Sequence, residues 1–282
     1  MLNVSLLSII CGALFLGGCC SRFAQAGGFF VRRKWRLWTV VAAAGLIAPS
    51  AVAQTFTRAP EAIQVLEQCS SAMGARSDLQ VDAEGTVVNA NAAAPEAHVA
   101  IKSKGFGQLR YDFADTKDAF VHSNGRSRAI HAGEPRPMSP AISRYLRPEY
   151  VPALLCSLDL ARDNMEVFYL GKEAVGSRTT YHIKFVARAA GKEDSDDVEQ
   201  LISEFHVYVD VQSMTVVKTK TYAFASDNVT NHSDWEHYYL DYRDVGGVLM
   251  PFHVVDFIGG QKLREITFTR VATDVSYTDA DF

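Results

Sequence analysis

Residues 239–253 read YLDYRDVGGVLMPFH, which is the pattern of a strand, a tight turn and a second strand. Gly246 and Gly247 separate two apolar and aromatic runs, and glycine pairs are typical of the turns that join antiparallel strands. Gly259 and Gly260 repeat the pattern just before the run 263–273. The end of the chain is therefore predicted to form consecutive antiparallel strands, over residues 235–243, 250–258 and 263–273.

Alternation of apolar and polar residues extends this prediction to most of the chain. Tyr181, Ile183 and Phe185 alternate with polar residues, and so do Phe205, Val207 and Val209. Such alternation indicates a sheet with one apolar and one polar face. The other predicted strands are residues 81–88, 97–104, 109–113, 119–122, 128–131, 166–172, 180–187, 203–209 and 215–224.

Few helices are expected. Residues 60–73 have a proline in the first turn, Gly74 just past the end, and apolar residues spaced by three and four, so they predict a helix with one buried stripe. Five prolines interrupt residues 135–163, where short helices are predicted over 141–146 and 151–160. The charged stretch 191–200 is predicted to be a solvated loop.

Composition and charge are those of a folded protein that does not bind nucleic acid. Of the 282 residues, 48% are hydrophobic and 21% are charged. Five of the 28 basic residues and none of the 32 acidic ones lie within residues 1–53, which leaves the rest of the chain with a formal charge of −9. Phosphate binding needs clustered cations, so this acidic body argues against a nucleic-acid partner.

Residues 31–53 have the pattern of a cleavable signal peptide. Four basic residues within 32–36 precede the apolar run 37–48, and Ala51-Val52-Ala53 forms an A-x-A cleavage site. A membrane anchor is the less favoured alternative, because a span needs roughly 20 apolar residues. The mature chain is expected to begin at or near Gln54, to be exported to the periplasm, and to form one domain over residues 54–282.

Residues 1–30 are interpreted as an upstream extension produced by a start codon assigned too early. Val31 directly precedes the basic residues, and a GTG start codon is read internally as valine. The alternative is a lipid anchor, because residues 16–19 (LGGC) resemble a lipobox that would make Cys19 the lipid-bearing first residue.

Two cysteines, Cys69 and Cys156, remain in the predicted mature chain. An exported protein with two cysteines can hold one disulfide. Both lie in apolar surroundings, so two buried free thiols are an equal alternative.

No catalytic or metal-binding motif stands out. The sequence has no G-x-S-x-G, P-loop, H-E-x-x-H or C-x-x-C motif. The densest polar cluster is residues 232–237 (HSDWEH), but on a strand His232 and His237 point to opposite faces, so a loop leading into an edge strand is favoured over a metal site. We therefore expect no enzymatic activity, no metal and no cofactor, unless residues distant in sequence converge.

Two stretches resemble LolA-like exported proteins. Residues 239–253, with the Gly259-Gly260 turn and the run 263–273, are similar to the family's C-terminal "D-Y-R-x-V-x-G-V-x-x-P" hairpins. Residues 99–126 are similar to its consecutive strands that end in an "S-[DN]-G-[KR]" turn, here Ser123-Asn124-Gly125-Arg126. With the helices, the resemblance covers nearly all of residues 60–282.

The resemblance implies an α+β fold, a strongly curved antiparallel sheet that forms an incomplete β-barrel, with a long N-terminal helix and short mid-chain helices over its concave face. It also implies a carrier for a lipid, a lipoprotein acyl chain or another hydrophobic ligand. The alternative is an envelope sensor or interaction module whose partner is a membrane protein of the envelope. The carrier's arginine-proline step is replaced here by Lys104-Gly105, which weakens the expectation of lipoprotein traffic but not that of the fold.

Aromatic and aliphatic residues of the predicted inner face are the candidate ligand contacts, and Lys104 is the candidate partner of an anionic head group. The alternative for each apolar residue is ordinary core packing. The apolar and aromatic candidates are Phe106, Leu109, Tyr111, Phe113, Tyr181, Phe185, Tyr222 and Phe224.

Overall fold

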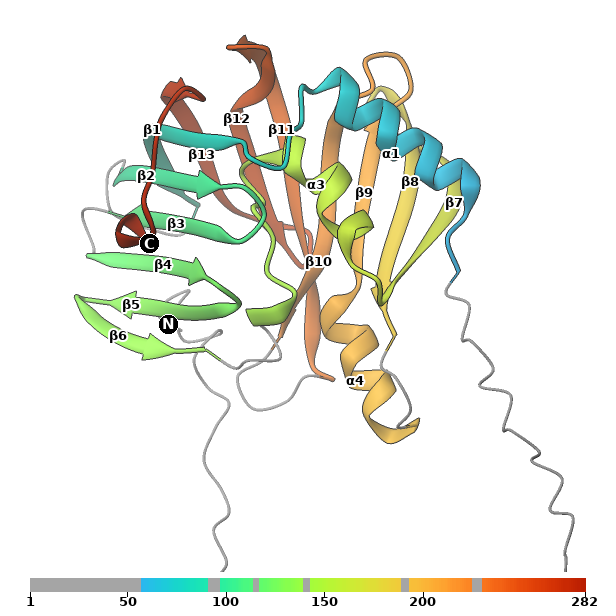
Figure 1. The fold of residues 1–282 in the computed structure, drawn as a ribbon, viewed down its shortest axis with the longest axis horizontal. Helices are drawn as coiled ribbons and strands as arrows, with labels where there is room; N and C mark the ends of the chain where they lie inside the picture. The colour runs from blue at the N-terminus through green and yellow to red at the C-terminus, as the bar shows by residue number, and fades with distance from the viewer. Residues whose placement is uncertain (1–56, 91–96, 114–116, 139–142, 189–192, 225–229) are drawn as a thin grey trace, which may run out of the picture. The chain divides into compact units, whose positions relative to one another are not determined.

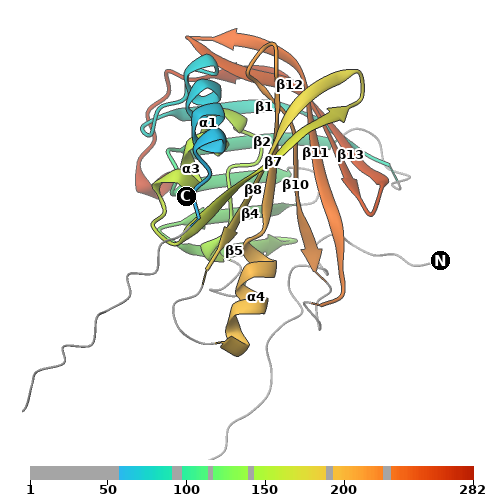
Figure 2. The same ribbon diagram turned by 90° about the vertical axis from the view of Figure 1, so that its right-hand side faces the viewer.

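A single antiparallel sheet of 13 strands dominates the computed structural model, which describes residues 57–90, 97–113, 117–138, 143–188, 193–224 and 230–282. The strand order is β6-β5-β4-β3-β2-β1-β13-β12-β11-β10-β9-β8-β7, and β6 and β7 are its open edges. Figures 1 and 2 show the sheet curving around the helices α1 and α3. The predicted incomplete barrel is therefore confirmed.

The strands follow the predicted positions closely, apart from β6, which the sequence did not predict. They are β1 (Gln80–Asn89), β2 (Ala97–Lys104), β3 (Gln108–Phe113), β4 (Asp118–Ser123), β5 (Arg126–His131), β6 (Glu134–Pro137), β7 (Met165–Val175), β8 (Arg178–Ala187), β9 (Phe205–Asp210), β10 (Val216–Phe224), β11 (His232–Val245), β12 (Val248–Ile258) and β13 (Gln261–Ala272). Strand β6 was not predicted because it contains two prolines. Prolines are tolerated there because β6 is an edge strand.

The sheet consists of two meanders that meet at one strand pair. Strands β1–β6 form the first meander and β7–β13 the second, and β1 pairs with β13 from Asp82↔Ala272 to Asn89↔Arg264. The register shifts between Glu84 and Gly85. A Cβ atom on Gly85 would lie 2.2 Å from the Thr267 carbonyl oxygen, so the junction requires glycine at this position.

Glycine turns set the register of the hairpins. Val245 pairs with Val248, and the intervening Gly246 and Gly247 have φ angles of 62° and 84°. These positive φ angles match a two-residue type I′ turn, whose twist suits antiparallel strands. The turn between β12 and β13 has the same construction, with φ angles of 56° and 76° at Gly259 and Gly260.

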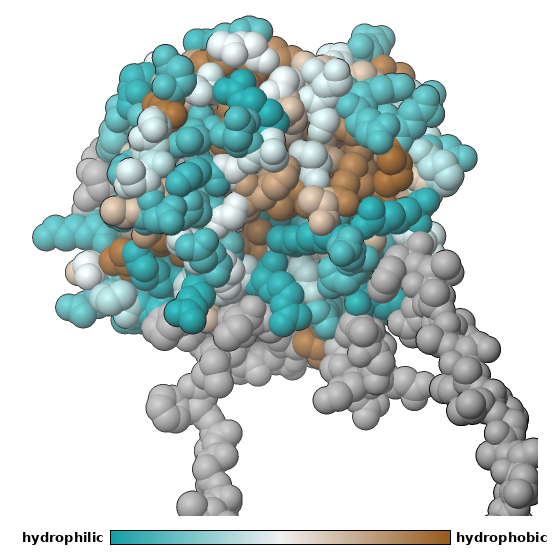
Figure 3. All heavy atoms as spheres, viewed as in Figure 1, coloured by the Kyte–Doolittle hydropathy of each residue, from teal (hydrophilic) through white to brown (hydrophobic). Residues whose placement is uncertain are grey.

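Helices α1 (Pro60–Ala72) and α3 (Pro152–Leu158) pack against each other over one face of the sheet. The predicted stripe of α1 is buried, and it joins a core built from both meanders. The chain just before α1 bonds to the edge strand β7, where Ala59 N–H donates to the Val167 carbonyl at 2.9 Å. Figure 3 shows this side of the molecule, with hydrophobic residues gathered below α1 among hydrophilic ones.

Cys69 on α1 and Cys156 on α3 are both free and fully buried. The disulfide considered from the sequence is therefore not formed in the structure, which has the alternative of two buried thiols. Burial, with a further contribution from the neighbouring Cys69, raises the pKa of the Cys156 thiol well above its usual value. A thiol that stays protonated in an apolar core is poorly reactive.

Two sequence predictions are wrong. The stretch 191–200, predicted to be a solvated loop, lies mostly within the helix α4 (Glu193–Ser203). The last turn of α4, beyond that stretch, carries the apolar Ile202, which packs against the core. Residues 232–237, predicted to be a loop leading into an edge strand, are the start of β11, which is a central strand between β10 and β12. Its polar start pairs with β10 from Phe224↔His232 onward.

The signal peptide, the cleavage site and Cys19 lie outside the described residues, as does part of the helix predicted over 141–146. Among the described residues, no helix is long and apolar enough to cross a membrane.

Replacing Gly85 by valine is expected to destabilise the protein by about 2–4 kcal/mol or to prevent folding, because the added atoms collide with the β13 backbone at the junction of the meanders. Urea unfolding monitored by circular dichroism measures the change. Gly107→Ala is the control, since a Cβ atom there meets nothing within 4 Å. Equal stability of the two variants would contradict the role assigned to Gly85.

Candidate functional site

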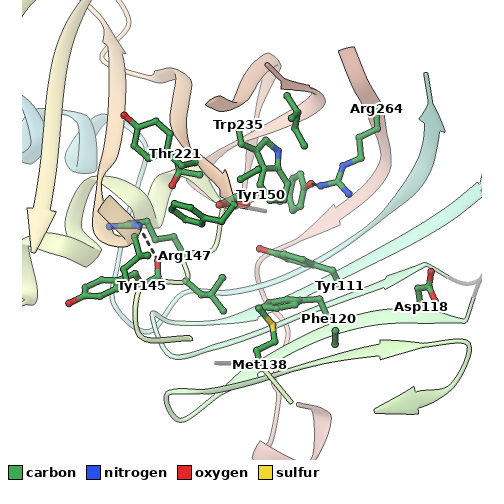
Figure 4. A pocket seen from close by; sticks show the side chains of 18 of the residues that line it. Tyr111, Asp118, Phe120, Met138, Tyr145, Arg147, Tyr150, Thr221, Trp235 and Arg264 are labelled. Atoms are coloured by element: carbon green, nitrogen blue, oxygen red, sulfur yellow. Dashed lines mark hydrogen bonds between the residues drawn. The ribbon is translucent and has the colours of Figure 1, made fainter. Parts of the chain in front are cut away.

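An apolar cavity of about 200 Å³ lies between the two meanders. One side is formed by β3–β5 and the other by β10–β13, with Ile202 of α4 contributing as well. The chain that connects the meanders passes between these sides, and its residues 143–151 are called the crossing segment. Figure 4 shows Tyr111, Phe120 and Met138 facing Tyr150, Thr221 and Trp235 across this space. The lining also includes Phe113, Asp118, Ala119, Ala129, Tyr145, Leu146, Arg147, Glu149, Tyr222, Ala223, Phe224, Ile258 and Arg264.

Aromatic rings form a continuous row along the cavity. Tyr111 lies 5.8 Å from Phe120 and 5.0 Å from Tyr150, between ring centroids. Tyr150 in turn lies edge-on to His237, which is 5.9 Å away, and His237 lies 5.4 Å from Trp235. This row includes residues of both meanders and of the crossing segment, so ring contacts connect all three parts at the cavity wall.

Arg147 anchors the crossing segment. Its Nε donates to Asp159 Oδ2 at 2.7 Å, and its terminal nitrogens donate to the carbonyls of Tyr145 and Ser203 at 2.9 and 3.1 Å. The guanidinium also lies 4.3 Å from the ring of Phe205. With 5% of its surface exposed, Arg147 is committed to these partners.

Three charged residues form a row on adjacent strands of the second meander, and one of them, Arg264, lines the cavity. His237 pairs in register with Asp256, and Asp256 pairs with Arg264. The Asp256 carboxylate lies 2.7 Å from His237 Nδ1 and 2.5 Å from Arg264 Nε. His237 and Asp256 are fully buried and Arg264 is 6% exposed, so these are interior ion pairs.

The crossing segment completes this charged row. Glu149 Oε2 lies 3.2 Å from His237 Nε2, and the Tyr150 hydroxyl donates to Asp256 at 2.9 Å and accepts from Arg264. Two carboxylates thus face two cations, and we call His237, Asp256, Arg264 and Glu149 the buried quartet. Its formal charge is zero when His237 is protonated.

Protonation of His237 is favoured by its surroundings. Burial alone would lower its pKa, but the charges of Asp256 and Glu149 outweigh burial and raise the pKa of His237 to about 10. The two cations His237 and Arg264 overcome the effect of burial on Asp256 and hold its pKa below the usual range. At neutral pH His237 is therefore protonated and Asp256 is ionised.

A hydrogen-bonded chain on the polar face also reaches the cavity wall. His182 Nδ1 lies 2.9 Å from Glu173, and its Nε2 lies 2.7 Å from Nδ1 of His206. His206 contacts Glu204, which accepts a hydrogen bond from the cavity residue Tyr222, both at 2.8 Å. Burial lowers the pKa of His206 to about 4, so this chain favours neutral histidine.

Four of the residues predicted from the sequence line the cavity: Tyr111, Phe113, Tyr222 and Phe224. Tyr111 and Phe113 come from the first meander and the other two from the second. The structure thus brings together two pairs that are about 110 residues apart in the sequence.

The other predicted residues lie outside the cavity lining. Leu109 and Phe185 are core residues with 2% and 0% exposure, and Phe106 and Tyr181 pack against that core. Lys104 forms an ion pair with Asp279 at 3.1 Å. These positions favour the core-packing alternative for the apolar residues, and the structure gives Lys104 a protein partner.

The buried quartet was missed by sequence reasoning, although a signal for it exists. In a strand that is buried on alternate residues, His237 shares its face with Trp235 and Tyr239. Counting back from the Gly246-Gly247 turn places Asp256 directly opposite His237. The register of this hairpin therefore predicts that His237 and Asp256 form a charged pair on neighbouring strands.

Comparisons of the fold identify its class. A domain from Vibrio parahaemolyticus described as an outer membrane lipoprotein-sorting protein aligns over 78% of this chain and 94% of its own, with 10% identity and a TM-score of 0.54. A LolA superfamily protein from Nitrosomonas europaea aligns over 78% and 96%, at 10% identity and a TM-score of 0.51. A DUF1329 family protein from Desulfovibrio piger aligns over 80% and 97%, at 12% identity and a TM-score of 0.51.

The chain therefore has a LolA-like fold, as its sequence motifs predicted. No protein-family model matches the sequence, and no curated protein matches it in sequence.

The stability of the protein is expected to fall as the pH rises from 6.5 towards 10. His237 has a raised pKa in the folded state, so its contribution is complete below about pH 6.5 and is lost as the proton leaves near pH 10. His237→Asn should lower the free energy of unfolding by about 3–5 kcal/mol at pH 6.5 and remove this part of the alkaline decline. Urea unfolding at several pH values measures both effects.

The matched control is His232→Asn, which changes an exposed histidine of the same strand and should keep the wild-type pH profile. An unchanged alkaline decline in His237→Asn would show that the buried quartet does not stabilise the fold in this way.

Proposed function

We propose that the protein is an exported binding or carrier protein that holds a hydrophobic ligand in the cavity between its meanders. The observation that carries this proposal is the cavity itself, whose walls are mainly aromatic and aliphatic. Apolar pockets with a few fixed polar groups are the usual form of small-molecule sites. The LolA-like fold is consistent with such a role, and the signal-peptide pattern of residues 31–53 supports export.

The cavity volume limits what can be enclosed. About 200 Å³ is only somewhat larger than an engineered apolar cavity of roughly 150 Å³ that takes up benzene. A segment of one acyl chain or one small ring system fits this space, and several acyl chains do not. Each methylene group transferred from water contributes about 0.8 kcal/mol, so a short segment already yields measurable binding.

The proposed mature protein, residues 54–282, is expected to bind the uncharged dye 1-N-phenylnaphthylamine with an increase in the dye's fluorescence. Ala223→Phe adds a ring at the cavity wall and should weaken binding at least about tenfold by filling the space. Ala174→Phe is the matched control, because Ala174 is an exposed residue of β7 outside the cavity lining.

Native mass spectrometry of the purified protein, followed by organic extraction, tests whether a ligand is carried from the cell. An extracted lipid supports the carrier. A protein that arrives empty and does not bind the dye would contradict the proposal and favour the alternative of an envelope interaction module.

A further inference from the structure

The charged side chains at the cavity wall are all paired within the protein. Arg264 is held by Asp256 at 2.5 Å, and Arg147 by Asp159 at 2.7 Å. The carboxylate of Glu149 lies 3.2 Å from His237, and that of Asp118 lies 2.9 Å from His131. The lining residues described by the structure therefore include no basic side chain that lacks a carboxylate partner.

This pairing has a consequence for a ligand with an anionic head. A carboxylate transferred into an apolar cavity needs a cation to offset its lost hydration. Arg264 and Arg147 are buried and already satisfied, so they could serve such a ligand only by leaving Asp256 or Asp159. Leaving a buried carboxylate without its partner is strongly destabilising.

The local electrostatics oppose a negative charge in the same place. Tyr111, whose ring lines the cavity, has a pKa well above its usual value because of burial and, next, because of the charge of Glu149. Glu149 is itself a lining residue, and its charge would act on a bound anion in the same direction.

We propose that the cavity selects uncharged apolar ligands over anionic amphiphiles, and that Glu149 and Asp256 enforce this selection by neutralising the cations near it. The inference rests on the proposed function and adds the class of ligand to it. Neutral esters, ketones and hydrocarbon chains belong to this class, and free fatty acid anions do not. Asp256 holds Arg264 away from the ligand, and Glu149 balances His237.

Three ligands with nine non-hydrogen atoms and the same six-carbon tail test the proposal: 2-methyl-1-octene, 2-octanone and heptanoate. Each is used to displace 1-N-phenylnaphthylamine from the mature protein at pH 7. The alkene and the ketone should displace the dye, and heptanoate should bind at least about a hundredfold more weakly than the ketone.

Glu149→Gln tests the residue assignment, because it removes one negative charge from the cavity wall. Heptanoate affinity should rise about tenfold relative to that of the ketone. Glu265→Gln is the matched control: it removes the same charge from a partly exposed position on β13 that contacts His253 and Lys262, and it should leave the ratio unchanged.

The outcomes distinguish a failure of the proposed function from a failure of the proposed selection. If neither dye nor alkene binds, the proposed function fails and the selection fails with it. If the dye and alkene bind but wild-type protein takes heptanoate as tightly as 2-octanone, the selection alone is overturned. A heptanoate-to-ketone ratio that is the same in folded Glu149→Gln and Glu265→Gln would overturn the role of Glu149. The comparison of heptanoate with 2-octanone uses the wild-type protein, so it tests the selection even if Glu149→Gln fails to fold.

Discussion

The pairing of β1 with β13 is the constraint on which the rest of the fold depends. It joins the strands that come first and last along the chain. The two meanders therefore form one curved sheet only when both ends of the strand sequence are present. The approach is close enough that Gly85 has no room for a side chain. Because the meanders extend from this junction in opposite directions, β6 and β7 are the two edges of the sheet, and the barrel is incomplete.

The open architecture explains why polar groups are buried at the cavity. The crossing segment lies on the chain between β6 and β7, and none of its residues belongs to a strand of the sheet. Arg147, Glu149 and Tyr150 instead connect it to Asp159, His237 and Asp256. A buried ion pair is rarely more stabilising than an apolar replacement, but it fixes one arrangement because each alternative leaves a charge without a partner. The buried quartet thus fixes how the segment lies beside the cavity.

Local features of the fold could be predicted from the sequence, whereas the meeting of distant segments could not. Alternation located nearly all the strands, and glycine pairs located the hairpins, because both signals act over a few residues. The helix α4 was missed because its charged first turns hid the apolar residues of its last turn. Tyr111 and Tyr222 both line the cavity, but nothing in their own strands shows that they meet there. Phe185 has the same pattern as Tyr222 and lies in the core, because what covers each strand depends on α1, α3 and the crossing segment.

The pairing of His237, Asp256 and Arg264 could be predicted from the sequence only in part. The register of His237 and Asp256 follows from a two-residue turn, and that of Arg264 follows from the next turn with one irregularity. Their pairing was thus accessible from the sequence, while Glu149 comes from a segment with no regular register. The same division applies to function. The sheet supplies an apolar concave face that suits many hydrophobic molecules, whereas the crossing segment supplies the carboxylate that balances the charge of His237. The selectivity proposed above therefore depends on the irregular segment that carries Glu149 as well as on the strand β12 that carries Asp256.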